Sequence, residues 1–176
     1  KIEQCYEGAP LEDLYLPYRP KRRTRATVAR EKGLEPLAAM LMRQDGARPD
    51  RLAERFVGGE VHDLQEALDG ACDIIAEWVS ESEAARSAMR RLFTREGVIS
   101  ARVVKGKEQE GAKYSDYFDW SEPLRRVAAH RLLAMVRAER EGFIKLSVLP
   151  DESAAVEQLE RIFIKRNPSP VRPLVE

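Results

Sequence analysis

Apolar side chains recur at helical spacing along most of this chain, and one stripe is longer than the others. From Asp63 to Val79 the apolar residues lie three and four positions apart, which is the pattern of a single buried face on an amphipathic helix. Gly70 lies inside this segment, and we expect it to let a neighbouring element pack closely. The predicted buried face comprises Leu64, Ala67, Leu68, Ala71, Ile74, Ile75 and Trp78.

Shorter stripes predict helices before this one. The spacing over residues 26–43 predicts two short helices that separate at Gly33, and residues 50–57 predict another that ends before Gly58. Short helices with basic outer faces are also found in helix-turn-helix modules. We therefore expect helix-turn-helix-like pieces in this part of the chain.

Helix-start signals predict three helices in the second half of the chain. Ser80 with Glu83 three residues later is a capping-box pattern. Ser121 is expected to cap a helix over residues 122–141, and Asp151 to begin the last helix. For the helix after Ser80, the predicted inward positions are Ala84, Ala88, Leu92 and Phe93.

The β-branched residues predict only a small amount of sheet. Strand-like pairs occur at residues 98–99 and 103–104, and residues 143–149 read as a strand. Residues 105–113 are too polar and glycine-rich to pack, and we predict a loop there. The fold class that we predict is mainly α, a multi-helix bundle with helix-turn-helix-like pieces and one or two short strands.

The composition is that of a globular protein and excludes several classes. A chain of 176 residues that is 43% hydrophobic fits one large domain or two small ones. We divide it into a basic arm with short helices over 1–60, a central helical region over 61–166 and a linker over 167–176. Cys5 and Cys72 suit a reducing compartment, and no signal peptide or membrane-spanning run is present, so we expect a cytoplasmic protein.

One basic segment, residues 11–37, is the first candidate for binding. The chain holds 30 basic and 30 acidic side chains, so a nucleic-acid role must come from local clustering of this kind. Pro17 and Pro20 predict a stiff, extended arm. Its cations suit phosphates and its tyrosines suit stacking, but the arm could equally pair with acidic parts of its own protein. The candidate residues are Tyr15, Tyr18, Arg19, Lys21, Arg22, Arg23 and Arg25.

A second charged segment, residues 105–120, sets three lysines beside four aromatic residues. One interpretation is a stacking platform for nucleic acid, with Lys105, Lys107 and Lys113 contacting phosphates. The interpretation that we prefer is structural, because aromatics at this density usually seal a loop onto the core. The aromatic residues are Tyr114, Tyr117, Phe118 and Trp120.

The residues that most often carry catalysis do not form a recognisable pattern. Asp116 and Asp119 lack a third ligand, and His62 and His130 have no metal-ligand spacing. We find no nucleophile motif and no phosphate-binding glycine loop. We therefore expect no metal, no cofactor and no enzymatic activity.

Two stretches of the chain carry a family resemblance. The first reads DLYLPYRPKRRTRA over residues 13–26 and continues with AREKGLEPL over residues 29–37. The second extends over residues 103–124 and is followed by His130 and Arg131. Together they resemble the bacterial Tex family of transcription accessory proteins. The chain departs from the family at Ala128-Ala129, where members usually carry proline and serine.

The resemblance implies an internal, helical part of a much longer cytoplasmic protein, ahead of its YqgF domain. Tex proteins are similar in architecture to a eukaryotic transcription elongation factor, and their nucleic-acid binding is mainly ascribed to helix-hairpin-helix and OB-fold parts that have no counterpart here. Their YqgF domain is regarded as lacking nuclease activity. The absence of an initiating methionine and the proline-rich end also lead us to expect a piece of a longer protein.

Two hypotheses for this region follow. In the first, the parent binds RNA or DNA and modulates transcription, and the basic arm adds phosphate contacts. In the second, the region is a structural scaffold and protein-interaction module with no nucleic-acid binding of its own, and RNA polymerase or another transcription protein is its candidate partner.

Overall fold

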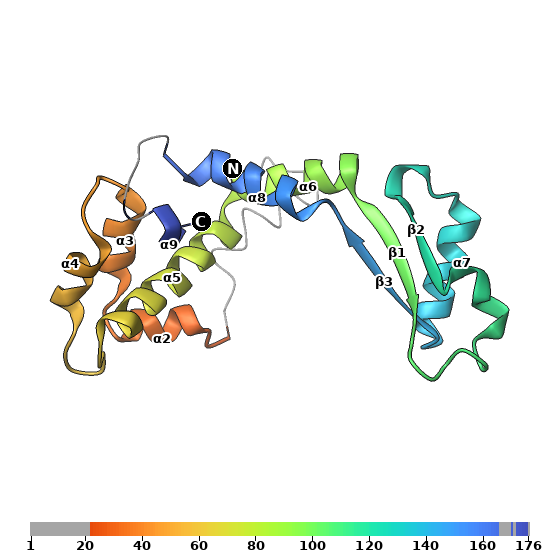
Figure 1. The fold of residues 1–176 in the computed structure, drawn as a ribbon, viewed down its shortest axis with the longest axis horizontal. Helices are drawn as coiled ribbons and strands as arrows, with labels where there is room; N and C mark the ends of the chain where they lie inside the picture. The colour runs from red at the N-terminus through yellow and green to blue at the C-terminus, as the bar shows by residue number, and fades with distance from the viewer. Residues whose placement is uncertain (1–21, 166–169, 171, 176) are drawn as a thin grey trace, which may run out of the picture. The chain divides into compact units, whose positions relative to one another are not determined.

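The computed structural model describes residues 22–165, 170 and 172–175, which belong to two compact units (Figure 1). Unit 1 comprises residues 1–87 and 159–176, and unit 2 comprises residues 88–158. Helices predominate in the described residues, together with one three-stranded antiparallel sheet, and this confirms the mainly α class. None of the described helices combines the length and the apolar composition needed to cross a bilayer.

The first helices of unit 1 follow the predicted pattern. α2 (Arg25–Glu31) and α3 (Glu35–Arg43) separate at Gly33, whose φ of +78° is a conformation that glycine adopts without strain. α4 (Pro49–Ala53) and the 3-10 turn η3 (Glu54–Phe56) follow. The element order is α2, turn and α3, and a DNA-binding helix-turn-helix here stays a prediction.

The long helix α5 (Leu64–Glu81) is the centre of unit 1, and Figure 1 shows the shorter helices around it. Its predicted stripe is confirmed, because α2, α3 and α4 pack against it and Ala67, Ala71, Ile74 and Ile75 are buried. Gly70 permits the closest approach. A Cβ atom at this position would lie 2.5 Å from Cδ1 of Leu34, a side chain that is only 1% exposed.

Gln44 joins two distant segments of unit 1. It ends α3 in the left-handed conformation, with φ of 49°, and it is 4% exposed. Its side-chain Nε2 donates to the carbonyl of Phe163 at 2.9 Å, while its Oε1 accepts from the backbone N–H of Lys165 at 2.9 Å. The amide therefore satisfies one backbone acceptor and one backbone donor at the C-terminal end of α8.

The predicted capping box at Ser80 is wrong. α5 continues past Ser80, whose hydroxyl donates to the carbonyl of Glu77 at 2.8 Å. α6 (Glu83–Glu96) instead begins after Ser82, where Oγ accepts from the backbone N–H of Ala85 at 3.4 Å. This later start rotates the helix relative to the prediction. Ala85 is buried and Ala84 is exposed, whereas the predicted burial of Ala88 and Leu92 is confirmed.

Unit 2 contains the sheet, in the order β2-β1-β3. β1 (Val98–Val103) and β3 (Ile144–Leu149) confirm the strands predicted from the β-branched residues. α7 (Ala129–Arg140) and the 3-10 helix η4 (Ala112–Tyr117) pack with the sheet. The buried residues of this second core are Ile99, Ala101, Tyr114, Met135, Ala138 and Ile144.

The helix predicted over residues 122–141 begins later than expected. Residues 119–123 form β2 (Asp119–Pro123), in which Ser121 pairs with Ser100 of β1 instead of capping a helix. The turn η5 (Leu124–Arg126) follows, and α7 begins at Ala129. Cross-strand pairing with β1 accounts for the difference, because a partner distant in sequence overrides a local capping signal.

The last long helix, α8 (Glu152–Phe163), begins as predicted after Asp151, which accepts from the backbone N–H of Ala154 at 3.1 Å. Its apolar stripe is less buried than the sequence suggested, since Val156 is 44% exposed and Ile162 is 39% exposed. A final turn, α9 (Arg172–Val175), packs against the core of unit 1.

Candidate nucleic-acid interface

The described part of the basic arm lies at the start of α2. Arg22, Arg23 and Arg25 are all exposed. Arg23 pairs with Glu31 at 2.7 Å, and Arg25, 88% exposed, lies 3.4 Å from Asp73. Exposed pairs of this kind contribute about 0–1 kcal/mol each, so a phosphate could displace either carboxylate. The other predicted arm residues lie outside the described residues: Tyr15, Tyr18, Arg19 and Lys21.

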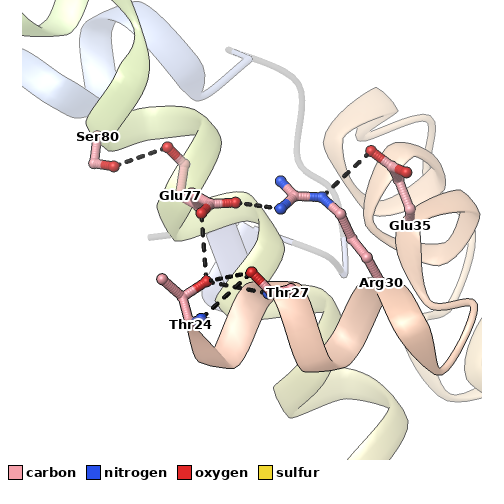
Figure 2. Close-up of polar contacts among 6 residues, drawn as sticks. All are labelled: Thr24, Thr27, Arg30, Glu35, Glu77 and Ser80. Atoms are coloured by element: carbon pink, nitrogen blue, oxygen red, sulfur yellow. Dashed lines mark hydrogen bonds and ion pairs between the residues drawn. The ribbon is translucent and has the colours of Figure 1, made fainter. Parts of the chain in front are cut away.

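A capping box fixes the root of this arm. Oγ1 of Thr24 accepts from the backbone N–H of Thr27 at 3.1 Å, and the backbone N–H of Thr24 donates to Oγ1 of Thr27 at 3.3 Å. The Thr24 hydroxyl also donates to Oε1 of Glu77 at 3.4 Å (Figure 2). The residue between Arg23 and Arg25 is therefore tied to α5.

An ion-pair network supports the same end of unit 1. Figure 2 shows Arg30 of α2 between Glu77 on α5 and Glu35 on α3. Nη1 of Arg30 pairs with Glu77, whose side chain is only 11% exposed, and Nε lies 3.6 Å from Glu35. The network joins three helices, so the arginines at the start of α2 project from a rigid base.

Beside the arm, carboxylates limit where a phosphate could bind. A hollow of about 460 Å³ between α2 and α5 is lined by Arg25 and Lys32 but also by Asp63, Asp69 and Asp73. These negative charges repel a phosphate inside the hollow. Any phosphate contact of the arm must therefore involve its outer, solvent-facing side.

The aromatic residues of the second predicted cluster pack inward. Tyr114 is 8% exposed and lies against Phe143, with 6.0 Å between ring centroids. Tyr117 meets Trp120 edge to face at 6.2 Å, and both pack against the core of unit 2. This arrangement agrees with the structural interpretation, because rings that face the core offer little surface for stacking bases.

Two of the three lysines in this cluster have carboxylate partners. Lys107 pairs with Glu110 at 2.8 Å, and Lys113 pairs with Glu141 at 2.7 Å while lying 4.8 Å from the centroid of the Tyr114 ring. The hydrogen bond to Glu141 raises the pKa of Lys113, and Lys113 in turn lowers the pKa of the Glu141 carboxyl. Lys105 is exposed and has no carboxylate partner in the described part of the chain.

Sequence reasoning missed a group of arginines in unit 2. Four are exposed on η5 and α7 and have no ion-pair partner among the described residues: Arg125, Arg126, Arg137 and Arg140. Arg131 differs from them, since Nη1 bonds both carboxylate oxygens of Glu122 at 2.9 and 3.1 Å and the guanidinium lies 4.8 Å from the centroid of the Trp120 ring. For Arg137 and Arg140, the signal that could have found them was the spacing of basic residues along a helix that also carries a buried stripe.

The described residues contain no group of three or more histidine, cysteine or acidic side chains arranged for a metal ion. Cys72 is a free thiol, and burial raises its pKa, which lowers its reactivity at neutral pH. Cys5 lies outside the described residues.

Comparison with known proteins identifies the family. Residues 44–168, well over half of the chain, match the family model described as Tex central region-like. The chain belongs to the Tex central region family. The matched range covers unit 2 entirely and part of unit 1, whereas the arm, α2 and α3 precede it.

Several curated bacterial proteins are similar to this chain. It is 40% identical over 162 residues to the transcriptional accessory protein Tex of Neisseria gonorrhoeae, covering 91% of this chain and 21% of that protein. It is 44% identical over 140 residues to protein tex of Bordetella pertussis, covering 78% and 18%. It is 46% identical over 152 residues to protein YhgF of Escherichia coli K12, covering 85% and 20%. The chain thus spans about a fifth of the length of these relatives, and their names indicate no enzymatic activity.

Proposed function

We propose that this region acts within a Tex-like transcription accessory protein that binds nucleic acid and modulates transcription in the bacterial cytoplasm. In this proposal Arg22, Arg23 and Arg25 add phosphate contacts to the binding surface of the whole protein. The observation that carries it is the exposure of all three guanidinium groups on a base that is anchored to α5 through Thr24.

The chemistry of the contact is an exchange of carboxylates for phosphates. Arg23 and Arg25 would leave Glu31 and Asp73, and their forked donors suit phosphate oxygens. Because the chain carries no net charge, binding should depend on these few side chains and not on a general positive field. Three contacts to a single strand predict a log-log salt slope of about −2.

Fluorescence anisotropy tests this proposal. Labelled single-stranded RNA and duplex DNA are titrated with the chain across a salt series, and with the Arg22→Ala/Arg23→Ala/Arg25→Ala variant. We expect micromolar binding that weakens with salt and is lost in the variant. The matched control removes three other exposed arginines of unit 1, Arg43, Arg51 and Arg55, and should bind as the unchanged chain does.

The second candidate function is a scaffold and protein-interaction module. The pairs of Arg23 with Glu31 and of Arg25 with Asp73 favour it, since these carboxylates neutralise two arginines of the arm within unit 1. In that case the chain should bind neither the single-stranded RNA nor the duplex DNA at low salt. RNA polymerase or another transcription protein then becomes the partner to test. Equal loss of binding in the control variant would also contradict specific contacts by the arm.

A further inference from the structure

The outer face of α7 combines exposed apolar and basic side chains. We define this face by His130, Leu133, Val136, Arg137 and Arg140, which lie on one side of the helix at spacings of three and four residues. Among the described large hydrophobic residues Leu133 is the most exposed, at 70%, and Val136 is 46% exposed. The opposite side of α7 is already used, because Met135 and Ala138 are fully buried in the core of unit 2.

The charges of α7 are segregated in the same way. Its one acidic residue, Glu139, accepts from the backbone N–H of Leu146 on β3 at 2.8 Å. Glu141, immediately after the helix, accepts from the Tyr114 hydroxyl at 3.0 Å and pairs with Lys113. Arg140 has no carboxylate partner within residues 22–165. Arg137 makes no direct ion pair there, although its charge contributes to the lowered pKa of the Glu141 carboxyl. The outer face therefore carries positive charge beside its exposed aliphatic groups.

The shape of the face suits an elongated apolar ligand. A shallow hollow of about 550 Å³ is lined by the five residues of the outer face together with Ala134. Leu133 and Val136 contribute apolar surface to this hollow, and removing such surface from water favours association. Arginines at the margin of an apolar patch are a common arrangement in protein interfaces.

A nucleic acid would match the basic side chains of this face but not its apolar side chains. Phosphates would satisfy Arg137 and Arg140 but would leave Leu133 and Val136 in water. The imidazole of His130 is the one ring on this face that could stack on a base. A protein segment with carboxylates beside apolar side chains matches both kinds of side chain. Charge complementarity and apolar burial therefore favour an acidic amphipathic helix as the ligand.

We propose that the outer face of α7 is a docking site for an acidic amphipathic helix of a protein partner. The apolar side chains of the partner cover Leu133 and Val136, and its carboxylates pair with Arg137 and Arg140. This site lies in unit 2 and uses none of the arm residues, so it stands or falls independently of phosphate binding by Arg22, Arg23 and Arg25.

The test uses the whole 176-residue chain and a designed peptide as the probe. The peptide is about 18 residues long, enough for helix formation in water, with leucines at helical spacing flanked by glutamates. Calorimetric titration should give micromolar affinity that weakens with salt. The Arg137→Glu/Arg140→Glu variant should lose at least about tenfold in affinity, and a peptide with lysines in place of the glutamates should recover binding to that variant.

Matched controls separate the site from general charge and stickiness. Arg51→Glu/Arg55→Glu makes the same charge change on exposed arginines of unit 1 and should leave peptide affinity unchanged. Leu133→Ser should weaken binding several-fold, whereas Leu149→Ser, at a leucine that is 62% exposed on β3, should not. All of these side chains are exposed, and circular dichroism of each variant should match that of the unchanged chain.

Two results would overturn the proposal. One is an absence of peptide binding up to about 1 mM, or equal affinity of the Arg137→Glu/Arg140→Glu variant for the acidic peptide. The other is binding of labelled RNA that the same variant abolishes while the peptide fails to compete. That result would assign the outer face of α7 to nucleic acid instead of protein.

Discussion

At the scale of single residues, Glu77 is the less exposed acidic partner in a network through which Arg30 joins three helices of unit 1. Its carboxylate accepts from Thr24 and pairs with Arg30, and Arg30 also reaches Glu35. The two acidic partners of Arg30 differ in burial, with Glu77 at 11% exposed and Glu35 at 55%. A carboxylate removed from water contributes more when paired, and leaves a larger penalty when lost, than one at the surface.

We therefore predict that Glu77→Ala lowers the free energy of unfolding by about 1–3 kcal/mol, because Arg30 loses its less exposed carboxylate partner and the Thr24 hydroxyl loses an acceptor. Glu35→Ala, the matched control, should change it by less than about 1 kcal/mol. Urea unfolding followed by tryptophan fluorescence measures both. Equal effects of the two substitutions would contradict the role assigned to Glu77.

Glu66 makes the stability of unit 1 depend on pH. The backbone N–H of His62 donates to its Oε2 at 2.7 Å and Lys32 pairs with Oε1, and these partners lower the pKa of the Glu66 carboxyl. A lowered folded-state pKa means that the contribution is present above the unfolded-state pKa of about 4 and is lost as the pH falls through the folded value.

The expected result is that Glu66→Gln is less stable than the unchanged chain at pH 6, and that this difference shrinks as the pH falls below about 4. Thermal unfolding between pH 6 and pH 3 provides the measurement. Glu60→Gln, at an exposed position nearby, serves as the control and should follow the unchanged chain at every pH. If the stability difference between Glu66→Gln and the unchanged chain grows toward low pH, the pKa of Glu66 is not lowered by folding.

At the scale of elements, the contact of α5 with the turn between α2 and α3 requires a residue without a side chain. The Cβ of an alanine at position 70 would lie 2.5 Å from Cδ1 of Leu34 and 3.3 Å from Cβ of Ala29. Leu34 is 1% exposed, so displacing its side chain would disturb the packing of the unit 1 core. Overpacking there opposes the roughly 1 kcal/mol that alanine gains over glycine within a helix.

We predict that Gly70→Ala is destabilising by roughly 1 kcal/mol overall, because the clash exceeds the gain in helix propensity. In a Leu34→Ala background the clash is absent, and adding Gly70→Ala should then be neutral or stabilising. Chemical denaturation of the four proteins in this cycle measures the reversal. If the sign is the same in both backgrounds, close packing is not the reason for this glycine.

The edges of the sheet show another element-scale feature. On β3 the backbone N–H of Leu146 donates to the Glu139 side chain, and β2 ends in Pro123, which has no N–H to donate. Both devices reduce the capacity of an edge strand to pair with a further strand. Strand addition is therefore a poorer mode of partner binding for unit 2 than docking on a helix face.

At the scale of the whole molecule, each unit has its own core and its own tryptophan. Trp78 packs against the core of unit 1, and Trp120 packs against the core of unit 2. Because the chain has only 2 tryptophans, Trp78→Phe and Trp120→Phe variants each leave one reporter. The two units can thus be followed separately in one chain.

We expect Met135→Ala, at a fully buried site of unit 2, to lower the stability reported by Trp120 by about 2–5 kcal/mol and to leave the transition reported by Trp78 in place. Leu37→Ala, fully buried in unit 1, should do the reverse. Urea unfolding of the single-tryptophan variants measures both transitions. Equal shifts in both reporters would mean that the units unfold as one cooperative body.

The predicted domain boundary at residue 60 falls inside unit 1, whose core draws on residues from both sides of it. α2, α3 and α4 precede the boundary, and α5, on which they pack, follows it. The pattern of apolar residues shows that each helix has a face to bury, but it does not state which partner covers that face. Contact between segments distant in sequence decides the unit to which each helix belongs.

The sequence by itself determined the features that depend on near neighbours. The apolar stripe of α5, the break at Gly33 and the start of α8 after Asp151 all follow from spacing or capping within a few residues. The family could also be recognised from contiguous motifs, and the comparisons confirm it. Such features can be predicted without tertiary information because the hydrogen bonds of a helix join residues close in sequence.

The tertiary structure decided what depends on residues far apart. β2 forms because β1 supplies a partner about twenty residues away, and Lys113 is neutralised by Glu141, which lies on another element. Arg25 likewise pairs with Asp73, which is distant in sequence. Arg137 and Arg140 of α7 form no direct ion pair within the described residues, and this too only the folded chain shows. A charge run in the sequence shows where cations are, whereas only the folded chain shows which of them its own carboxylates already occupy.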